Sequence, residues 1–447
     1  MSPAPAKSSV VESIQSSSPQ ERQQFVVRSF TDNYDSLIAN DAKAWRGKFR
    51  KMSQSAIAFY RGSAALYYAD LSRDNDPFVN RQNSRVWIQG DLHAENFGTY
   101  MNGAGVLVFD VNDFDEAYVG PFNWDVKRFI TGLGLIGYDK ALSDAEIREV
   151  MRHAARSYAQ QVARFSAGLD DDFTLTLGNT DGKLREVLMS ARLLTRVGLL
   201  DRDTEIVDGD RRFRSRPEDR LDEATRASIE SALADYYLTI PPKKRRSMAA
   251  HAVKDSVRRR GMGIGSAGLL LYSVLLEGET QALENDIIIS IKHSQPAAPA
   301  RFIDDPEIKA YFKHDGHRTA ISQRALQAHA DPLLGHATMD GRGMYVSEVS
   351  PYTADLDWDD INDVDDILQV VGYLGRCVAK IHCISDSDSD QTLIDYSTED
   401  AIHGVLGGNE PDYADYMANF GEQYAAIVRS DHRLFVDAFR NHQVPGV

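Results

Sequence analysis

The sequence has little of two features that would each point to a particular class of protein. Only two of its 447 residues are cysteines, Cys377 and Cys383. Two thiols cannot form a disulfide framework or, alone, a four-ligand zinc site, so they favour a reducing compartment. The longest apolar runs, such as 129–138 and 268–276, have about half of the ~20 residues that a membrane-spanning helix needs. We therefore expect a soluble protein.

Basic residues are also scarce relative to acidic ones. Lys and Arg total 50 against 66 Asp and Glu, which gives a formal net charge of −16. A surface of this sign repels phosphate backbones, so we expect no nucleic-acid partner, although a local basic pocket for a small anion is compatible with it. The first residues, MSPAPAK, lack the apolar core of a signal peptide. Together with the cysteine usage, this predicts a cytoplasmic protein without a membrane partner.

Composition divides the chain into four segments. Residues 1–20 are rich in Ser, Pro and Gln, which is typical of a disordered lead-in. Helical spacing of apolar residues dominates 21–250, strand-like runs dominate 251–350, and 351–447 returns to helical patterns. The pattern predicts an α+β protein with a large, mostly helical lobe and a small β-rich lobe.

The most informative residues follow two short apolar strands expected in the first half of the chain. Asp91 and Asn96 are five positions apart in GDLHAEN, directly after the first strand, and Asp113 comes after the second, in VFDVNDFDE. In phosphoryl transfer, a first Asp accepts the proton of the attacking hydroxyl, whereas an Asn and a later Asp hold Mg²⁺. The spacing therefore favours Mg²⁺-dependent chemistry on phosphates.

Two other interpretations of these residues stay open. Asp, Asn and Gly are common turn residues at strand ends. Alternatively, Asp91, His93 and Glu95 are a set of side chains that could bind another divalent metal. The order and separation of the two motifs favour Mg²⁺ and phosphate.

A glycine-rich segment with the pattern G-x-G-x-x-G occurs much later in the chain, at Gly263, Gly265, Ser266 and Gly268. A dinucleotide-binding turn needs an apolar strand before it and a helix after it. Here charged residues precede the glycines and an apolar strand follows. A second strand then ends near Lys292. Glycines between strands, followed by such a lysine, are typical of the phosphate-covering loop and phosphate-holding lysine of kinases. The alternative is a glycine-rich hairpin with an exposed lysine.

The motifs occur in an unusual order. In kinases the glycine-rich loop and the lysine precede the catalytic Asp, but here they follow it. A circular permutation would account for this order, with the small lobe inserted after most of the large lobe. The strand expected at 343–349 would then lead to the connection between the lobes. The helix expected at 362–384 would precede the catalytic loop in unpermuted relatives.

Three blocks of sequence together resemble a known family: GDLHAENFG at 90–98, FDVNDFDEA at 109–117 and GPFNWDVKRF at 120–129. They are similar to a widespread microbial family of unknown function that is grouped with the protein-kinase-like and aminoglycoside-phosphotransferase-like fold. The resemblance implies a two-lobe fold, ATP and Mg²⁺ as cofactors, and a small-molecule acceptor. It also implies that Asp91 is the catalytic base and that Asp125 is a buried residue that braces the catalytic loop.

The resemblance implies further roles. Asn96 and Asp113 would be metal ligands, and Lys292 would hold the α- and β-phosphates. His93 occupies the place where phosphotransferases of this type have a histidine instead of the lysine of many protein kinases, or else it is structural. Asp115 either assists the metal or caps the turn.

One position departs from the kinase pattern. The phosphate lysine of kinases is held by a Glu on the next helix, but residues 310–330 contain no Glu. Gln323, or Glu307 at the start of the helix, is the expected substitute. We therefore predict an ATP- and Mg²⁺-dependent phosphotransferase that acts on a hydroxyl of a small molecule. The missing Glu leaves two alternatives, a nucleotide-binding pseudokinase with a regulatory role and a transferase of AMP to protein.

Overall fold

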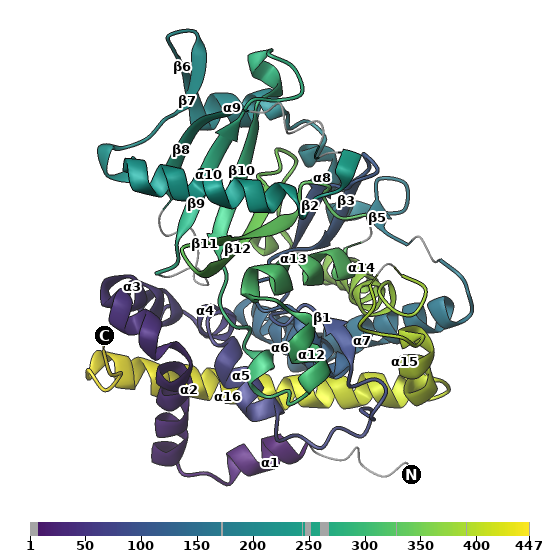
Figure 1. Cartoon of the computed structure of the whole chain (residues 1–447). Helices are drawn as coiled ribbons and strands as arrows, with labels where there is room; N and C mark the ends of the chain where they lie inside the picture. Colours follow the sequence, from purple (N-terminus) through teal and green to yellow (C-terminus); the bar gives the residue numbers. More distant parts are fainter. Residues whose placement is uncertain are drawn as a thin grey trace.

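The protein is a mixture of helices and small antiparallel sheets in a computed structural model (Figure 1). The structure describes residues 8–170, 173–243, 245, 252–259, 268–327, 329–389 and 391–446. The predicted α+β class is confirmed. Within the described part of the chain, every helix is too short or too polar to cross a lipid bilayer. Cys377 and Cys383 are buried free thiols.

Most helices form one body in the lower half of Figure 1, which we call the helical body. Its N-terminal helices are α1 Ser9–Gln15, α2 Pro19–Asn40, α3 Ala42–Met52, α4 Ala56–Arg61 and α5 Ala64–Leu71. The others are α6 Phe122–Asp139, α7 Asp144–Ser166, α14 Val364–Cys383, α15 Thr398–Leu406 and α16 Glu410–Arg440. The long helix α16 lies along the base of the body, and α6 is buried along nearly its whole length.

The structure differs from the predicted disorder of residues 1–20. Residues 1–7 lie outside the described part, but α1 and the start of α2 are helical. Val10 and Val11 are buried in the apolar cluster that α2, α3 and α16 share. The prediction failed because it rested on the average Ser, Pro and Gln content of residues 1–20 and not on this apolar pair. Ser18 and Glu21 also form a capping box that starts α2.

Short strands within the helical body carry the loops of the first motif. Strand β1 Val86–Ile88 pairs with β4 Tyr118–Gly120. A second sheet has the order β2-β3-β5, in which β2 Phe97–Met101 and β3 Leu107–Val111 form a hairpin and β5 Leu175–Thr176 adds an edge. The side chain of Gln89, directly after β1, donates to the carbonyl oxygens of Asn112 and Asp113, directly after β3, so the ends of these two strands lie next to one another.

The upper part of the molecule, which we call the sheet part, contains a five-stranded antiparallel sheet with the order β11-β12-β10-β9-β8. Its strands are β8 Val253–Arg259, β9 Leu271–Leu276, β10 Ile287–His293, β11 Gly335–Met339 and β12 Arg342–Glu348. Side chains alternate between its faces, so that Ile287, Ile289 and Ile291 join one apolar cluster whereas Ile288 joins another. Helix α13 Asp315–Leu326 connects β10 to β11.

The predicted boundary at residue 250 differs from the structure. Both faces of the five-stranded sheet are covered by elements that precede it in sequence: α9 Arg196–Asp203, β6 Thr204–Val207, β7 Asp210–Phe213 and α10 Glu223–Tyr237. Ile229, Leu233 and Tyr236 of α10 pack in one cluster, and Leu200 of α9 packs in the other. Residues 196–240 therefore belong to the sheet part, because the sheet needs an apolar cover on each face. Helix α8 Gly182–Ala191 precedes them and packs beside β3.

Candidate functional site

A cavity of about 640 Å³ lies between the five-stranded sheet and the β2–β3 hairpin. The sheet part contributes Lys292 of β10 and Tyr345 of β12, and α13 contributes Gln323. The turn after β3 contributes Asp113 and Asp115. A concave site of this size with a few convergent polar groups is typical of small-molecule binding. The fold thus brings the predicted acidic motif and the predicted lysine to one cavity.

The loop that carries Asp91 begins on a buried support. The carboxylate of Asp125 in α6 accepts hydrogen bonds from the backbone N–H groups of Gln89 at 2.6 Å and Gly90 at 2.9 Å. His382, near the end of α14, brings its Nε2 to 3.5 Å from the same carboxylate. Gly90 has φ +83°, and a Cβ there would lie 1.9 Å from the carbonyl oxygen of Glu116. The start of the loop therefore requires glycine and is fixed by Asp125.

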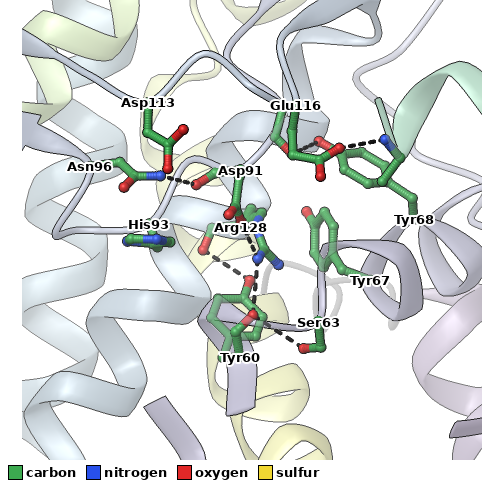
Figure 2. A network of polar contacts seen from close by, with 12 residues as sticks. Tyr60, Ser63, Tyr67, Tyr68, Asp91, His93, Asn96, Asp113, Glu116 and Arg128 are labelled. Atoms are coloured by element: carbon green, nitrogen blue, oxygen red, sulfur yellow. Dashed lines mark hydrogen bonds and ion pairs between the residues drawn. The ribbon is translucent and has the colours of Figure 1, made fainter. Parts of the chain in front are cut away.

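Asp91 and Asn96 are held in place by different contacts (Figure 2). The Asp91 carboxylate accepts a hydrogen bond from Nε of buried Arg128 at 2.7 Å, and Nη2 of the same guanidinium contacts it as well. The side-chain amide of Asn96 donates to the carbonyl oxygen of Asp91 at 2.8 Å, which leaves its Oδ1 available. Burial raises the pKa of Asp91 to about 7, although Arg128 opposes this shift.

Asp113 adopts a backbone conformation that is unusual for a residue other than glycine, with φ +52°. Its carbonyl oxygen and that of Asn112 accept hydrogen bonds from the Gln89 side chain, which holds the turn in this shape. Burial and the neighbouring Asp115 charge raise the pKa of Asp113, and Lys292 opposes them. No cationic group of the described residues lies within ion-pair distance of its carboxylate.

The oxygens of Asn96 and Asp113 suit Mg²⁺, which takes one or two protein ligands together with phosphate oxygens and water. The two residues are neighbours, because the N–H of Asn112 donates to the carbonyl oxygen of Asn96 at 3.0 Å. Among the residues that the structure describes, no group of three or more His, Cys, Asp or Glu is arranged to hold a metal.

The partner of Lys292 differs from both expected substitutes. Lys292 forms an ion pair with Asp115, and the two carboxylates Asp115 and Asp113 raise its pKa even though burial lowers it. Gln323 instead accepts a hydrogen bond from Tyr345 Oη at 2.6 Å, and Glu307 pairs with Arg85. The expectation for Gln323 and Glu307 is wrong because the lysine faces the turn after β3.

Asp115 is thus a counter-ion of Lys292. The two roles predicted for Asp115, assisting the metal and capping the turn, stay predictions. Its only signal in the sequence is a second carboxylate two residues after Asp113. His93 is buried, and burial holds its pKa well below the usual range. Its Nδ1 accepts the backbone N–H of Glu95 at 3.3 Å, so the neutral ring supports the loop. This contact favours the structural alternative for His93.

The glycine-rich segment is described only at its end. Gly263, Gly265 and Ser266 lie outside the described residues. Gly268 has φ +75°, and a Cβ there would lie 3.6 Å from Nε1 of Trp45 in α3. The end of this segment therefore lies against the N-terminal helices.

Several residues near Asp91 could not be predicted from the sequence. Lys48 and Tyr34 come from α3 and α2, and the charges that act on both include Glu116 and Asp91. Arg128 lies in one of the three sequence blocks that carry the resemblance, but nothing in the sequence indicates that it contacts Asp91. Lys48 and Tyr34 come near Asp91 only through the packing of the N-terminal helices.

Comparison with known proteins gives one match. Neither the curated proteins nor the solved structures contain a match to this chain. One family model, described as an uncharacterized protein conserved in bacteria, matches residues 40–438, which is most of the chain. The protein therefore belongs to this bacterial family, DUF2252.

Proposed function

We propose that the protein is an ATP- and Mg²⁺-dependent phosphotransferase with a kinase-like, circularly permuted two-lobe fold that acts on a hydroxyl of a small molecule. The observation that carries the proposal is that Lys292 of the sheet part and Asp113 of the turn after β3 line the same cavity. Kinases place a phosphate-binding lysine and a metal-binding Asp in the same relation to a bound nucleotide. A volume of about 640 Å³ is sufficient for such a ligand.

The connectivity of the sheet part supports the kinase-like assignment. The glycine-rich connection joins β8 to β9, Lys292 lies on the third strand, β10, and helix α13 follows. Kinases have a glycine-rich loop followed by a lysine on the third strand and then a helix. After β12 the chain returns to the helical body.

The end of α14 supports the permutation. Its residue His382 contacts Asp125, and Asp125 in turn fixes the start of the Asp91 loop. The end of α14 thus lies beneath a loop that is far away in sequence. In an unpermuted chain the helix would continue directly into that loop.

The residues of the site suggest how transfer would proceed. Asp91 accepts the proton of the acceptor hydroxyl as the oxygen bonds to the γ-phosphorus and the bond between that phosphorus and ADP breaks. A pKa of about 7 suits a group that takes a proton near neutral pH. Arg128 orients the Asp91 carboxylate, and Lys292 exchanges Asp115 for nucleotide phosphate. Mg²⁺ on Asn96 and Asp113 would supply charge neutralisation.

The proposal is tested by incubating the protein with ATP and Mg²⁺ and measuring ADP by chromatography and the protein by mass spectrometry. We expect slow ADP formation with water as acceptor. Asp91→Asn should lower it by roughly 100-fold or more while ATP binding persists, whereas exposed Asp359→Asn should match the wild type. Binding without any turnover would favour the pseudokinase, and a gain of AMP by the protein would favour nucleotidyl transfer.

A further inference from the structure

Lys48 of α3 is a buried cation that forms no ion pair with the described residues. The residue is 7% exposed, and its Nζ lies 4.6 Å from the ring centroid of Trp45 and 5.1 Å from that of Tyr34. No carboxylate in the described part of the chain lies within ion-pair distance of it. Aromatic rings offset only part of the cost of burying an ammonium group. A group of this kind needs a further partner.

The N-terminal helices are shaped to present Lys48 beside Asp91. Helix α2 is interrupted at Tyr34, which has the non-helical angles φ −130° and ψ 15°. The interruption brings the Tyr34 ring to 4.8 Å from the Trp45 ring. Nη2 of Arg301 fixes this bend through a hydrogen bond of 2.7 Å to the carbonyl oxygen of Asn33.

The carboxylates that act electrostatically on Lys48 indicate the part of the site in which it lies. These charges are Glu116 and Asp91, and they do not include Asp113. The cavity that contains Asp113 and Lys292 is lined by neither Lys48 nor Asp91. Lys48 therefore lies outside the cavity that Asp113 and Lys292 line, within electrostatic reach of Asp91. This is where we expect the acceptor to bind.

Two other hydrogen-bond donors in this region also lack a partner among the described residues. Nη1 of Arg128 and Nε1 of Trp45 are buried, and neither has a hydrogen-bond acceptor among the residues described. Arg128 contacts Asp91 directly, and Trp45 contacts Lys48. Buried donors without acceptors are costly, so their accumulation beside Asp91 indicates a ligand rich in acceptor oxygens.

We propose that Lys48 binds an anionic group of the acceptor, either a carboxylate or a phosphate, while the acceptor presents its hydroxyl to Asp91. The inference deepens the proposed function and rests on it. It assigns the substrate class as a small hydroxyl compound that carries a negative charge. It also gives the helices α2 and α3 a role in specificity.

The test uses three matched three-carbon probes: glycerol 3-phosphate, glycerate and glycerol. Calorimetric titrations into the full chain, with ADP and Mg²⁺ present, measure the binding of each. We expect saturable binding of at least one of the two anionic probes and none of glycerol, and the stronger anion identifies the group. Lys48→Met should weaken that binding by about tenfold or more. Lys51→Met, an exposed lysine on the same helix, should leave it unchanged.

The outcomes separate this inference from the proposed function. If neither anion binds, or if Lys48→Met binds as the wild type does, the anion site is wrong even where ATP binds. If an anion binds through Lys48 but ATP does not bind with Mg²⁺, the anion site stands and the phosphotransferase fails. Unchanged thermal unfolding of Lys48→Met would show that lost binding is not lost folding.

Discussion

The charged side chains inside the helical body and those of the candidate site are paired in different ways. In the helical body, Arg22 contacts both Asp70 and Asp431, and Lys127 contacts both Asp74 and Asp76. At the site, Asp113 and Lys48 have no counter-ion in the described part of the chain, and the pKa of Asp91 is raised to about 7. The difference indicates that the ion pairs of Arg22 and Lys127 hold helices together, whereas the charged groups of the site are free to bind a ligand.

The largest effect on stability should come from breaking a pair in the helical body. Arg22→Met leaves the buried carboxylates of Asp70 and Asp431 without their cation, which should lower the free energy of unfolding by about 3–5 kcal/mol. Urea unfolding measures this change. Exposed Arg28 on the same helix provides the control Arg28→Met. Equal effects of the two variants would contradict the structural role of the Arg22 pair.

A smaller loss is expected at the start of the Asp91 loop. Gly90→Ala places a Cβ against the carbonyl of Glu116 at a positive φ and should cost roughly 3 kcal/mol. Gly209 has the same φ of +83° but open space around a Cβ, so Gly209→Ala should cost only about 1 kcal/mol. If both variants unfold at the same urea concentration, the close approach of the loop to Glu116 is wrong.

The sheet part also contains a cluster of three neutral histidines, and acid should reveal it. The rings of His314, His317 and His336 lie 4.7–6.3 Å apart. Burial lowers the pKa of His317 to about 4 and that of His336 to about 3. Between these values and the ordinary value of 6.5, the unfolded chain binds more protons, so stability falls as the pH falls through this range.

Between pH 7 and pH 5 we expect the free energy of unfolding, measured with urea, to fall by roughly 1–2 kcal/mol. His336→Gln should reduce this pH dependence, because the substituted side chain binds no proton in either state. His442→Gln changes an exposed histidine and should retain the dependence. An unchanged slope in His336→Gln would contradict the buried, neutral state of the ring.

The smallest effect on stability is expected at the cavity itself. The pair of Lys292 and Asp115 is partly open to solvent, so Lys292→Met should change the free energy of unfolding by less than about 1 kcal/mol. The same variant should weaken nucleotide binding by about tenfold or more. A loss of stability comparable to that of Arg22→Met would show that Lys292 is structural.

Much of this arrangement could be predicted because it depends on local sequence. The β-branched apolar run in DIIISIKH produces β10, and the capping box of Ser143 and Glu146 starts α7. The roles of Lys48 and Asp115 could not be predicted in the same way. Each depends on how segments distant in sequence pack together, and no local spacing in the chain records that packing.

The positions of the glycine-rich segment and the N-terminus also depend on packing between segments that are distant in sequence. Composition alone predicted disorder before residue 20, but the burial of Val10 and Val11 depends on α16, some 400 residues away. Likewise, the position of Gly268 against Trp45 follows from the docking of α3 and not from the glycine pattern.

The central claim is that the cavity binds a nucleotide with Mg²⁺, and calorimetric titration of ATP tests it most directly. The titration is made with and without Mg²⁺, on the wild type and on Asp113→Asn, whose carboxylate charge is removed with little change of shape. We predict binding that requires Mg²⁺ and that the variant loses. No binding to the wild type in either condition would contradict the account.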